Sequence, residues 1–173
     1  MQYILWLFFI IVCLVVLLKV FSTLISLYYG SPSGETTAKL AKYIFQEINL
    51  GCKDTLVDLG SGLGNTLLVA SKIFKARSIG YEISPLPYII SKMRTIKNKN
   101  IQIIQANIFE ADIKKATVIF CYLLPKLLAS LAPKLKSACQ TGAIIISPVF
   151  QIKGLKLDKK ILFRNKIIYV YKI

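Results

Sequence analysis

Two acidic residues, Asp58 and Glu82, stand at the ends of two apolar segments that are roughly twenty residues apart. Asp58 follows Leu56-Val57, and Glu82 follows Gly80-Tyr81. A carboxylate at the end of a strand can accept hydrogen bonds from both hydroxyls of a ribose, and it can also pair with a cationic group. The two residues therefore predict a nucleoside site that tolerates positive charge.

The segment that follows Asp58 contains Gly60, Ser61, Gly62 and Gly64 and predicts a tight turn between a strand and a helix. Dinucleotide sites use G-x-G-x-x-G, whereas this pattern is D-x-G-x-G-x-G and lacks the lysine of a P-loop. A carboxylate before the turn repels a pyrophosphate but suits a ligand with an ammonium and a sulfonium. The pattern favours S-adenosylmethionine (SAM). Another nucleotide, or a tight turn with an incidental acid, is the alternative.

Strands alternate with helices along most of the chain, and this pattern indicates a mostly parallel sheet. The two last β-rich segments flank Arg164-Asn165 and predict an antiparallel hairpin. The predicted fold is an α/β, Rossmann-like sheet that ends in this hairpin. Strands are expected at 55–59, 77–83, 101–105, 117–123, 143–150, 155–163 and 167–173, and helices at 35–49, 65–74, 85–98 and 125–139, the last interrupted near Pro133.

Four polar residues fall at or just after the ends of four predicted strands: Asp58, Glu82, Asn107 and Tyr122. Ligands of open α/β sheets bind beyond the carboxyl ends of the strands. We therefore expect these four side chains to converge on one crevice. Asn107 has an alternative role as a turn residue, and Tyr122 as a buried strand end.

The N-terminal segment predicts a membrane anchor. Residues 3–18 carry no charge, and the apolar pattern continues past Lys19 to residue 29. A helix of this length spans a hydrocarbon core of ~30 Å if Lys19 reaches the headgroups. The chain lacks a basic segment before this stretch and a small-x-small cleavage site after it, which disfavours the alternative of a cleaved signal peptide. The expected organisation is an anchor at 1–29 that contacts the bilayer through residues 3–28, a linker at 30–34 and a domain at 35–173.

Composition narrows the classes of activity and partner. The chain has no histidine, which excludes Ser-His-Asp and Cys-His hydrolase mechanisms and removes the commonest zinc ligand, so no metal site is predicted. The formal net charge is +15, with 23 Lys and Arg against 8 Asp and Glu. An anionic inner leaflet or a genome-wide preference for lysine explains this excess better than nucleic acid, because no aromatic and basic ribbon is present. The positive-inside tendency places the domain in the cytoplasm as part of a single-pass membrane protein.

The chain resembles class I SAM-dependent methyltransferases. More narrowly, it resembles the membrane-anchored lysine methyltransferases that modify the ATP-synthase c-subunit and the adenine nucleotide translocase, together with their short bacterial relatives. The resemblance runs from the anchor to Phe150. It rests on Val57-Asp-Leu-Gly-Ser-Gly-Leu-Gly64, Gly80-Tyr-Glu-Ile-Ser-Pro85, Ala106-Asn-Ile-Phe109, Tyr122-Leu-Leu-Pro125 and Leu131-Ala-Pro-Lys-Leu135.

The resemblance implies roles for the matching residues. Asp58 and the backbone of Gly60, Ser61, Gly62 and Gly64 would hold the methionine end of SAM. Glu82 would bind the ribose hydroxyls. Asn107 stands where relatives usually carry Asp and would accept a hydrogen bond from the adenine amino group. The Ile108 N–H would meet the adenine ring. Tyr122 and Pro125 would shape the acceptor pocket.

The implied activity is methylation of lysine in a membrane protein. Methylation of a lipid headgroup or of a membrane-soluble small molecule is one alternative. A non-catalytic, membrane-bound SAM sensor or scaffold is another, and the departure at Asn107 motivates it. Nucleic-acid amino-methylation is disfavoured, because Tyr122-Leu-Leu-Pro125 replaces the expected (Asp/Asn)-Pro-Pro-(Tyr/Phe).

Overall fold

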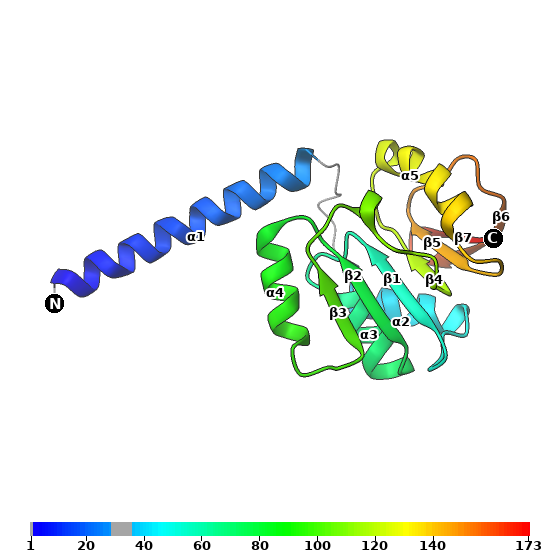
Figure 1. The fold of residues 1–173 in the computed structure, drawn as a ribbon, viewed down its shortest axis with the longest axis horizontal. Coiled ribbons are helices and arrows are strands. Elements are labelled where there is room, and N and C mark those ends of the chain that lie inside the picture. The colour runs from blue at the N-terminus through cyan, green and yellow to red at the C-terminus, as the bar shows by residue number, and fades with distance from the viewer. Residues whose placement is uncertain (1, 29–35) are drawn as a thin grey trace.

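A computed structural model describes residues 2–28 and 36–173, and within these residues seven strands form one sheet in the order β3-β2-β1-β4-β5-β7-β6 (Figure 1). Strands β1 to β5 run parallel to one another, and β7 joins β5 in the antiparallel direction and pairs with β6 as a hairpin. The mostly parallel sheet with an antiparallel C-terminal hairpin is confirmed. The strands are β1 Thr55–Leu59, β2 Arg77–Tyr81, β3 Ile101–Ile104, β4 Val118–Phe120, β5 Ile144–Pro148, β6 Leu157–Phe163 and β7 Lys166–Lys172.

Helices cover both faces of the sheet, because neighbouring strand residues point to opposite sides. Leu56 belongs to one core cluster together with residues of α2 and α3. Its neighbour Val57 belongs to the other cluster, together with residues of α5. Helix α4 packs beside β3 at one edge of the sheet. The helices are α1 Gln2–Tyr28, α2 Ala38–Glu47, α3 Asn65–Phe74, α4 Pro85–Thr95 and α5 Pro125–Ala138, and a short 3-10 turn, η1, covers Ile108–Glu110.

Most elements differ from the sequence-based expectation at one or both ends, and the strands β2 to β6 and the helices α2, α4 and α5 are shorter than predicted. Two differences have a clear physical cause. Helix α5 is continuous through Pro133, so the predicted interruption is wrong. Pro133 lies on the exposed side of α5, where water can reach the carbonyl that the missing N–H leaves unpaired, and Leu131 and Leu135 hold the helix on the core. Strand β5 ends at Pro148 because Val149 has a φ of +70° and Phe150 N–H donates to the Pro148 carbonyl.

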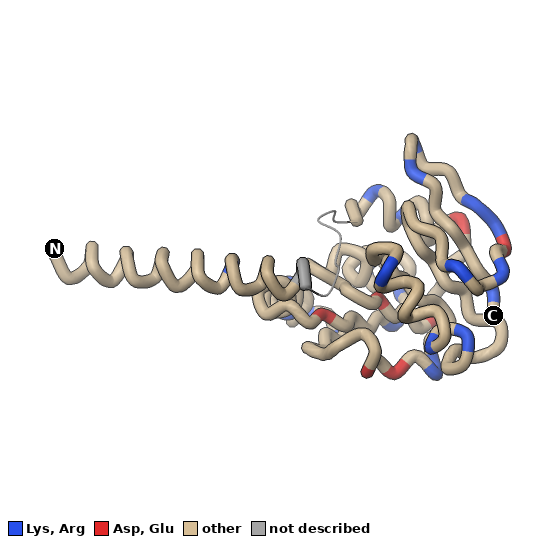
Figure 2. Tube along the Cα trace, turned by 90° about the horizontal axis from the view of Figure 1, so that it is seen from above, with Lys and Arg blue, Asp and Glu red and all other residues tan. Residues whose placement is uncertain are grey.

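Helix α1 extends away from the domain, and its carboxyl end contacts α4 (Figure 1). The 24 residues Gln2–Ile25 are long and apolar enough to cross a membrane. Lys19 is the only charged residue of α1, whereas lysines and arginines are spread over the domain (Figure 2). The predicted linker, residues 30–34, lies outside the described residues.

A hydrogen bond of a buried tyrosine in the hairpin contributes to the stability of the core. The Tyr171 side chain is fully buried, and its hydroxyl accepts a hydrogen bond from Ile152 N–H at 2.7 Å. We expect Tyr171→Phe to lower the free energy of unfolding by about 1–3 kcal/mol, because it leaves this buried N–H without a partner. Chemical denaturation measures the loss. Tyr169→Phe, on the same strand and only half-buried, is the matched control, and equal losses in both variants would contradict the explanation.

Candidate active site

The glycine turn after β1 is bent back onto the end of β2. Gly60, Gly62 and Gly64 have φ values of +85°, +53° and +76°, which side chains other than glycine rarely adopt. The N–H groups of Gly60 and Ser61 both donate to the Tyr81 carbonyl, at 2.9 and 3.0 Å. The glycines predicted from the sequence therefore serve a turn whose backbone is held close to the neighbouring strand.

Gly80 on β2 makes this close approach possible. A Cβ atom at Gly80 would lie 2.5 Å from the Leu67 Cδ1 atom and 2.6 Å from the Ser61 Oγ atom, so any other residue would push the turn away. Among the described residues, the buried Ser61 hydroxyl has no hydrogen-bond partner. A ligand that lies on the turn can supply one. The sequence motif included Gly80, but its steric role becomes visible only in the fold.

Glu82 is held by the backbone on two sides. Its side chain is 7% exposed; Oε2 accepts from Gly62 N–H and Oε1 accepts from Ser84 N–H, each at 2.8 Å. An ionised carboxylate offers about four acceptor positions, so about two remain for a ligand. This arrangement suits the pair of hydroxyls of a ribose.

Asp58 is 3% exposed and accepts a hydrogen bond from the Thr66 hydroxyl. Burial raises the pKa of Asp58 to about 7, although the bond from Thr66 opposes the rise, and the negative charge of nearby Glu82 adds to it. No ion pair with either carboxylate is present among residues 2–28 and 36–173. Two such acids accommodate a cationic ligand well, because its charge would stabilise the ionised form of Asp58. Thr66, in the first turn of α3, was missed by the sequence analysis.

A lysine on α5 and an asparagine within the loop hold the segment that follows β3. Asn107 is half-buried, and its Oδ1 accepts from Phe109 N–H at 3.1 Å, which makes Asn107 the N-cap of η1. Asn107 thus has the turn role that was the alternative in the sequence analysis, and the adenine contact stays a prediction. Ile108 is the first residue of η1, where the N–H has no partner within the helix. The Lys134 ammonium donates to the carbonyls of Ile108 and Phe109, at 3.4 and 2.6 Å. No pattern in the sequence indicated this function of Lys134.

The predicted acceptor segment contacts the glycine turn. Tyr122 is half-buried and follows β4, and Pro125 is exposed at the first position of α5. The Leu123 Cδ2 atom between them lies 3.1 Å from the position that a Cβ on Gly60 would take. Asp58, Glu82, Asn107 and Tyr122 thus lie at the carboxyl ends of four adjacent strands, β1, β2, β3 and β4, as expected.

An arginine on α4 bonds to the glycine turn. Like the contacts of Thr66 and Lys134, this one was not predicted from the sequence. Arg94 donates to the Leu63 carbonyl at 2.6 Å and to Asn65 Oδ1 at 3.0 Å. Asn65 Nδ2 donates in turn to the Thr36 carbonyl at 3.3 Å. These bonds join the glycine turn to α4 and to the segment that enters the domain.

The fold and the site define a class I SAM-dependent methyltransferase. Residues 58–159 match the model of the ANTKMT methyltransferase domain, and the chain belongs to this family. SAM is the cofactor of this class. The site is compatible with its charges and hydroxyls, because it offers two carboxylates, a glycine turn with little side-chain bulk and the Ser61 hydroxyl, which has no partner among the described residues. No cluster of three or more potential metal ligands occurs in the described part of the chain.

Individual relatives support this assignment. A protein-lysine N-methyltransferase of Saccharolobus islandicus is 29% identical over 71% of this chain and 79% of its own length. A ribosomal protein L11 methyltransferase of Alkaliphilus oremlandii is 28% identical over 76% of this chain, which spans only 41% of that protein. The structure of an RNA methyltransferase from Salinibacter ruber in complex with S-adenosyl-L-homocysteine has a TM-score of 0.77 at 26% identity and covers 81% of this chain and 94% of its own.

The raised pKa of Asp58 predicts a pH dependence of SAM affinity. Below a pKa of about 7 the carboxyl holds a proton, which a cationic ligand must displace. We expect affinity to rise by up to about tenfold per pH unit as the pH approaches 7 from below. Calorimetric titration of the full chain with SAM measures this. The same shift means that the ligand-free domain loses stability as the pH rises from 3.8 to about 7, because ionisation is easier in the unfolded chain.

Asp58→Asn is the control for this pH dependence. The variant should bind SAM weakly at every pH and should unfold at a higher temperature than the parent above pH 7, because it buries no charge. An affinity of the parent chain that stays constant from pH 5.5 to 7 would contradict the assigned role of Asp58.

Proposed function

We propose that the chain is a membrane-anchored protein-lysine N-methyltransferase that modifies a membrane protein. The observation that carries the proposal is the similarity to a protein-lysine N-methyltransferase over 71% of the chain and 79% of that relative. Family membership and the SAM site support the methyl transfer itself. Helix α1 supports the location of the substrate, because an anchor raises the effective concentration of proteins in the same bilayer.

The contacts of the site residues support the roles proposed for them. Asp58 would pair with the ammonium of the methionine end, and the backbone of Gly60, Ser61, Gly62 and Gly64 would hold that end. Glu82 would use its two remaining acceptor positions for the ribose hydroxyls.

At the adenine end, Asn107 and Ile108 would contact the base, and Lys134 holds their loop in place through its two bonds to backbone carbonyls. The Asn107 oxygen already caps η1, so it offers one remaining lone pair to the adenine amino group.

When bound, SAM supplies a methyl group on a positively charged sulfur. The chain must bring a deprotonated lysine amine to this group and exclude water. We assign this task to Tyr122 and Pro125, and the close approach of Leu123, which lies between them, to Gly60 supports the assignment. An apolar pocket lowers the pKa of a substrate lysine by penalising its charged form. No general base is required if water accepts the proton before the amine enters the pocket.

The anchor orients the enzyme. Helix α1 spans the bilayer through Gln2–Ile25, and the basic domain lies on the cytoplasmic side, where SAM is made. The intact mass of the chain isolated from membranes checks that α1 is retained, because cleavage of a signal sequence would remove it.

The substrate class is tested by incubating the full chain with methyl-labelled SAM and native membranes. We expect the label in protein, as methyllysine in a digest of the modified band. Label in the lipid fraction would instead identify a headgroup or a membrane-soluble small molecule as acceptor. Absence of label despite SAM binding would identify a sensor or scaffold.

Transfer to RNA is the second candidate, because a similar solved structure is that of an RNA methyltransferase. An arm of the same experiment with total RNA tests it. Label in RNA alone would overturn the protein-lysine assignment and leave the methyltransferase assignment intact.

The ribose contact is tested by Glu82→Gln. The amide keeps the size of the side chain but loses the negative charge and one acceptor oxygen. We expect SAM affinity to fall by roughly 10- to 100-fold, the effect of losing charge-assisted hydrogen bonds. Asp158→Asn, an exposed acid on β6, makes the same change of charge and should bind SAM normally. Equal affinity of Glu82→Gln and the parent chain would contradict the assignment.

A further inference from the structure

Helix α4 has its polar and apolar faces reversed relative to the usual arrangement. The buried residues of α4 are Ser91 and Thr95, whose small side chains allow close contact with Gly64. Ile89, Met93 and Ile96, by contrast, are 43%, 69% and 78% exposed and follow one another at helical spacing. A helix on the surface of a domain normally buries such a stripe. The outward stripe therefore indicates an apolar partner.

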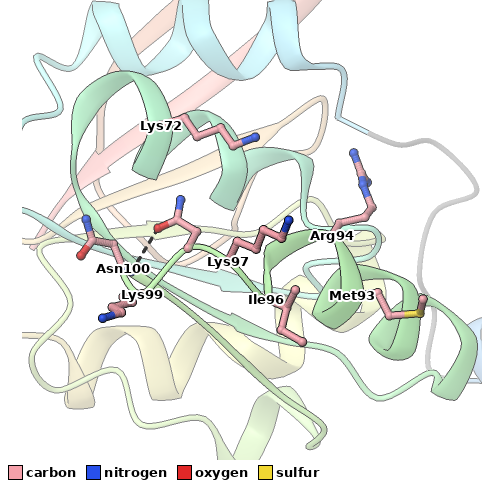
Figure 3. A pocket seen from close by; sticks show the side chains of 8 residues that line it. Lys72, Met93, Arg94, Ile96, Lys97, Lys99 and Asn100 are labelled. Carbon is pink, nitrogen blue, oxygen red and sulfur yellow. Dashed lines mark hydrogen bonds between the residues drawn. The ribbon is translucent and has the colours of Figure 1, made fainter.

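Basic side chains surround this stripe. An open hollow of about 450 Å³ lies between the ends of α3 and α4, and no acidic residue lines it. Lys72 and Lys97 extend toward the space between the two helices, whereas Met93 and Ile96 point away from α3 (Figure 3). The lining includes the basic residues Lys72, Arg94, Lys97 and Lys99. Arg94 is already bonded to the glycine turn, so the lysines are the cations available to a partner.

An apolar stripe flanked by lysines is the pattern of a helix that lies in the interface of an anionic bilayer. Nucleic acid would match the lysines but not the stripe, which offers aliphatic side chains where base stacking needs aromatic ones. The position of the stripe also favours lipid, because α4 lies beside the carboxyl end of the proposed anchor. The carboxyl end of α1 contacts α4, and Leu18, Ser22 and Ile25 form the less exposed side of α1.

We propose that a surface formed by Ile89 and Met93 of α4 and by Ile96, Lys97 and Lys99 of the turn after it lies on an anionic bilayer beside the anchor. The proposal rests on the proposed span of α1. The lysines contact lipid phosphates, and the stripe enters the region between headgroups and acyl chains.

This contact would set the orientation of the active site. Helix α4 begins at Pro85, directly after the loop that carries Glu82, and Arg94 bonds to the glycine turn. A bilayer contact along α4 would therefore fix the orientation of Glu82 and of the glycine turn relative to the membrane surface. The enzyme would then reach lysines that lie near the headgroups, rather than lysines on distant soluble domains.

A fluorescence experiment on the full chain tests this contact. The chain is reconstituted into phosphatidylcholine vesicles with or without phosphatidylglycerol, and a bimane fluorophore is attached at Ile96→Cys in a Cys52→Ser background, because Cys52 is an exposed thiol. Lipids with a shallow nitroxide group should quench the fluorophore several-fold more at this position than at Leu162→Cys. Leu162 is 66% exposed on β6, at the opposite edge of the sheet. The Cys52→Ser parent corrects for labelling at the other cysteines.

Charge variants test the electrostatic part of the contact. Each basic residue near an anionic surface strengthens binding by roughly fivefold. Lys97→Glu with Lys99→Glu should therefore reduce quenching at position 96 in vesicles that contain phosphatidylglycerol, and added salt should do the same. Lys166→Glu, an exposed charge on the hairpin, is the matched control and should leave quenching unchanged.

Flotation of the vesicles separates this inference from the anchor. A chain that floats with the vesicles but shows equal quenching at positions 96 and 162 would overturn the role of α4 and leave the anchor standing. A chain that does not float would overturn both. An emission change on addition of tRNA, without quenching by nitroxide lipid, would assign the face to nucleic acid and also overturn the proposal. None of these outcomes depends on methyl transfer.

Discussion

The close contact between the glycine turn and strand β2 is the constraint on which the site depends. It exists because Gly80 has no side chain and because two N–H groups of the turn share the Tyr81 carbonyl. The contact brings the Gly62 N–H to Glu82, which in turn binds the Ser84 N–H before α4. Three elements are thereby fixed by one carboxylate: the turn, the end of β2 and the start of α4.

The electrostatics of the site follow from this packing. Asp58 and Glu82 are both nearly buried, and within the described residues neither has an ion-pair partner. Burial raises the pKa of Asp58, so the ligand-free domain carries a cost that a cationic ligand removes. The site is thus matched to the charge of its cofactor at the expense of the stability of the empty domain, a common balance at functional sites.

The sequence alone determined the class of the protein. The spacing of Asp58, the glycines and Glu82 indicated SAM, and the alternation of strands and helices indicated the sheet and its hairpin. These features are local: a turn needs glycine where φ is positive, and a buried parallel strand needs a continuous apolar run. For the same reason the ranges of β1 and α3 were predicted to the residue, whereas the effect of Pro133 was not, because it depends on which side of α5 faces solvent.

Only the tertiary structure decided which residues support the site and which surface is left apolar. Lys134 and Arg94 bond to backbone carbonyls that are 25 and 31 residues away in the sequence, and Thr66 bonds to a carboxylate across the glycine turn. No spacing rule connects these pairs. The exposure of Ile89, Met93 and Ile96 depends likewise on α4 packing through its small polar face, whereas periodicity alone would assign the apolar side to the core. Turns and strands depend on residues that are close in the sequence, so the sequence predicts them. Contacts and exposure depend on how distant segments pack, so they become visible only in the tertiary structure.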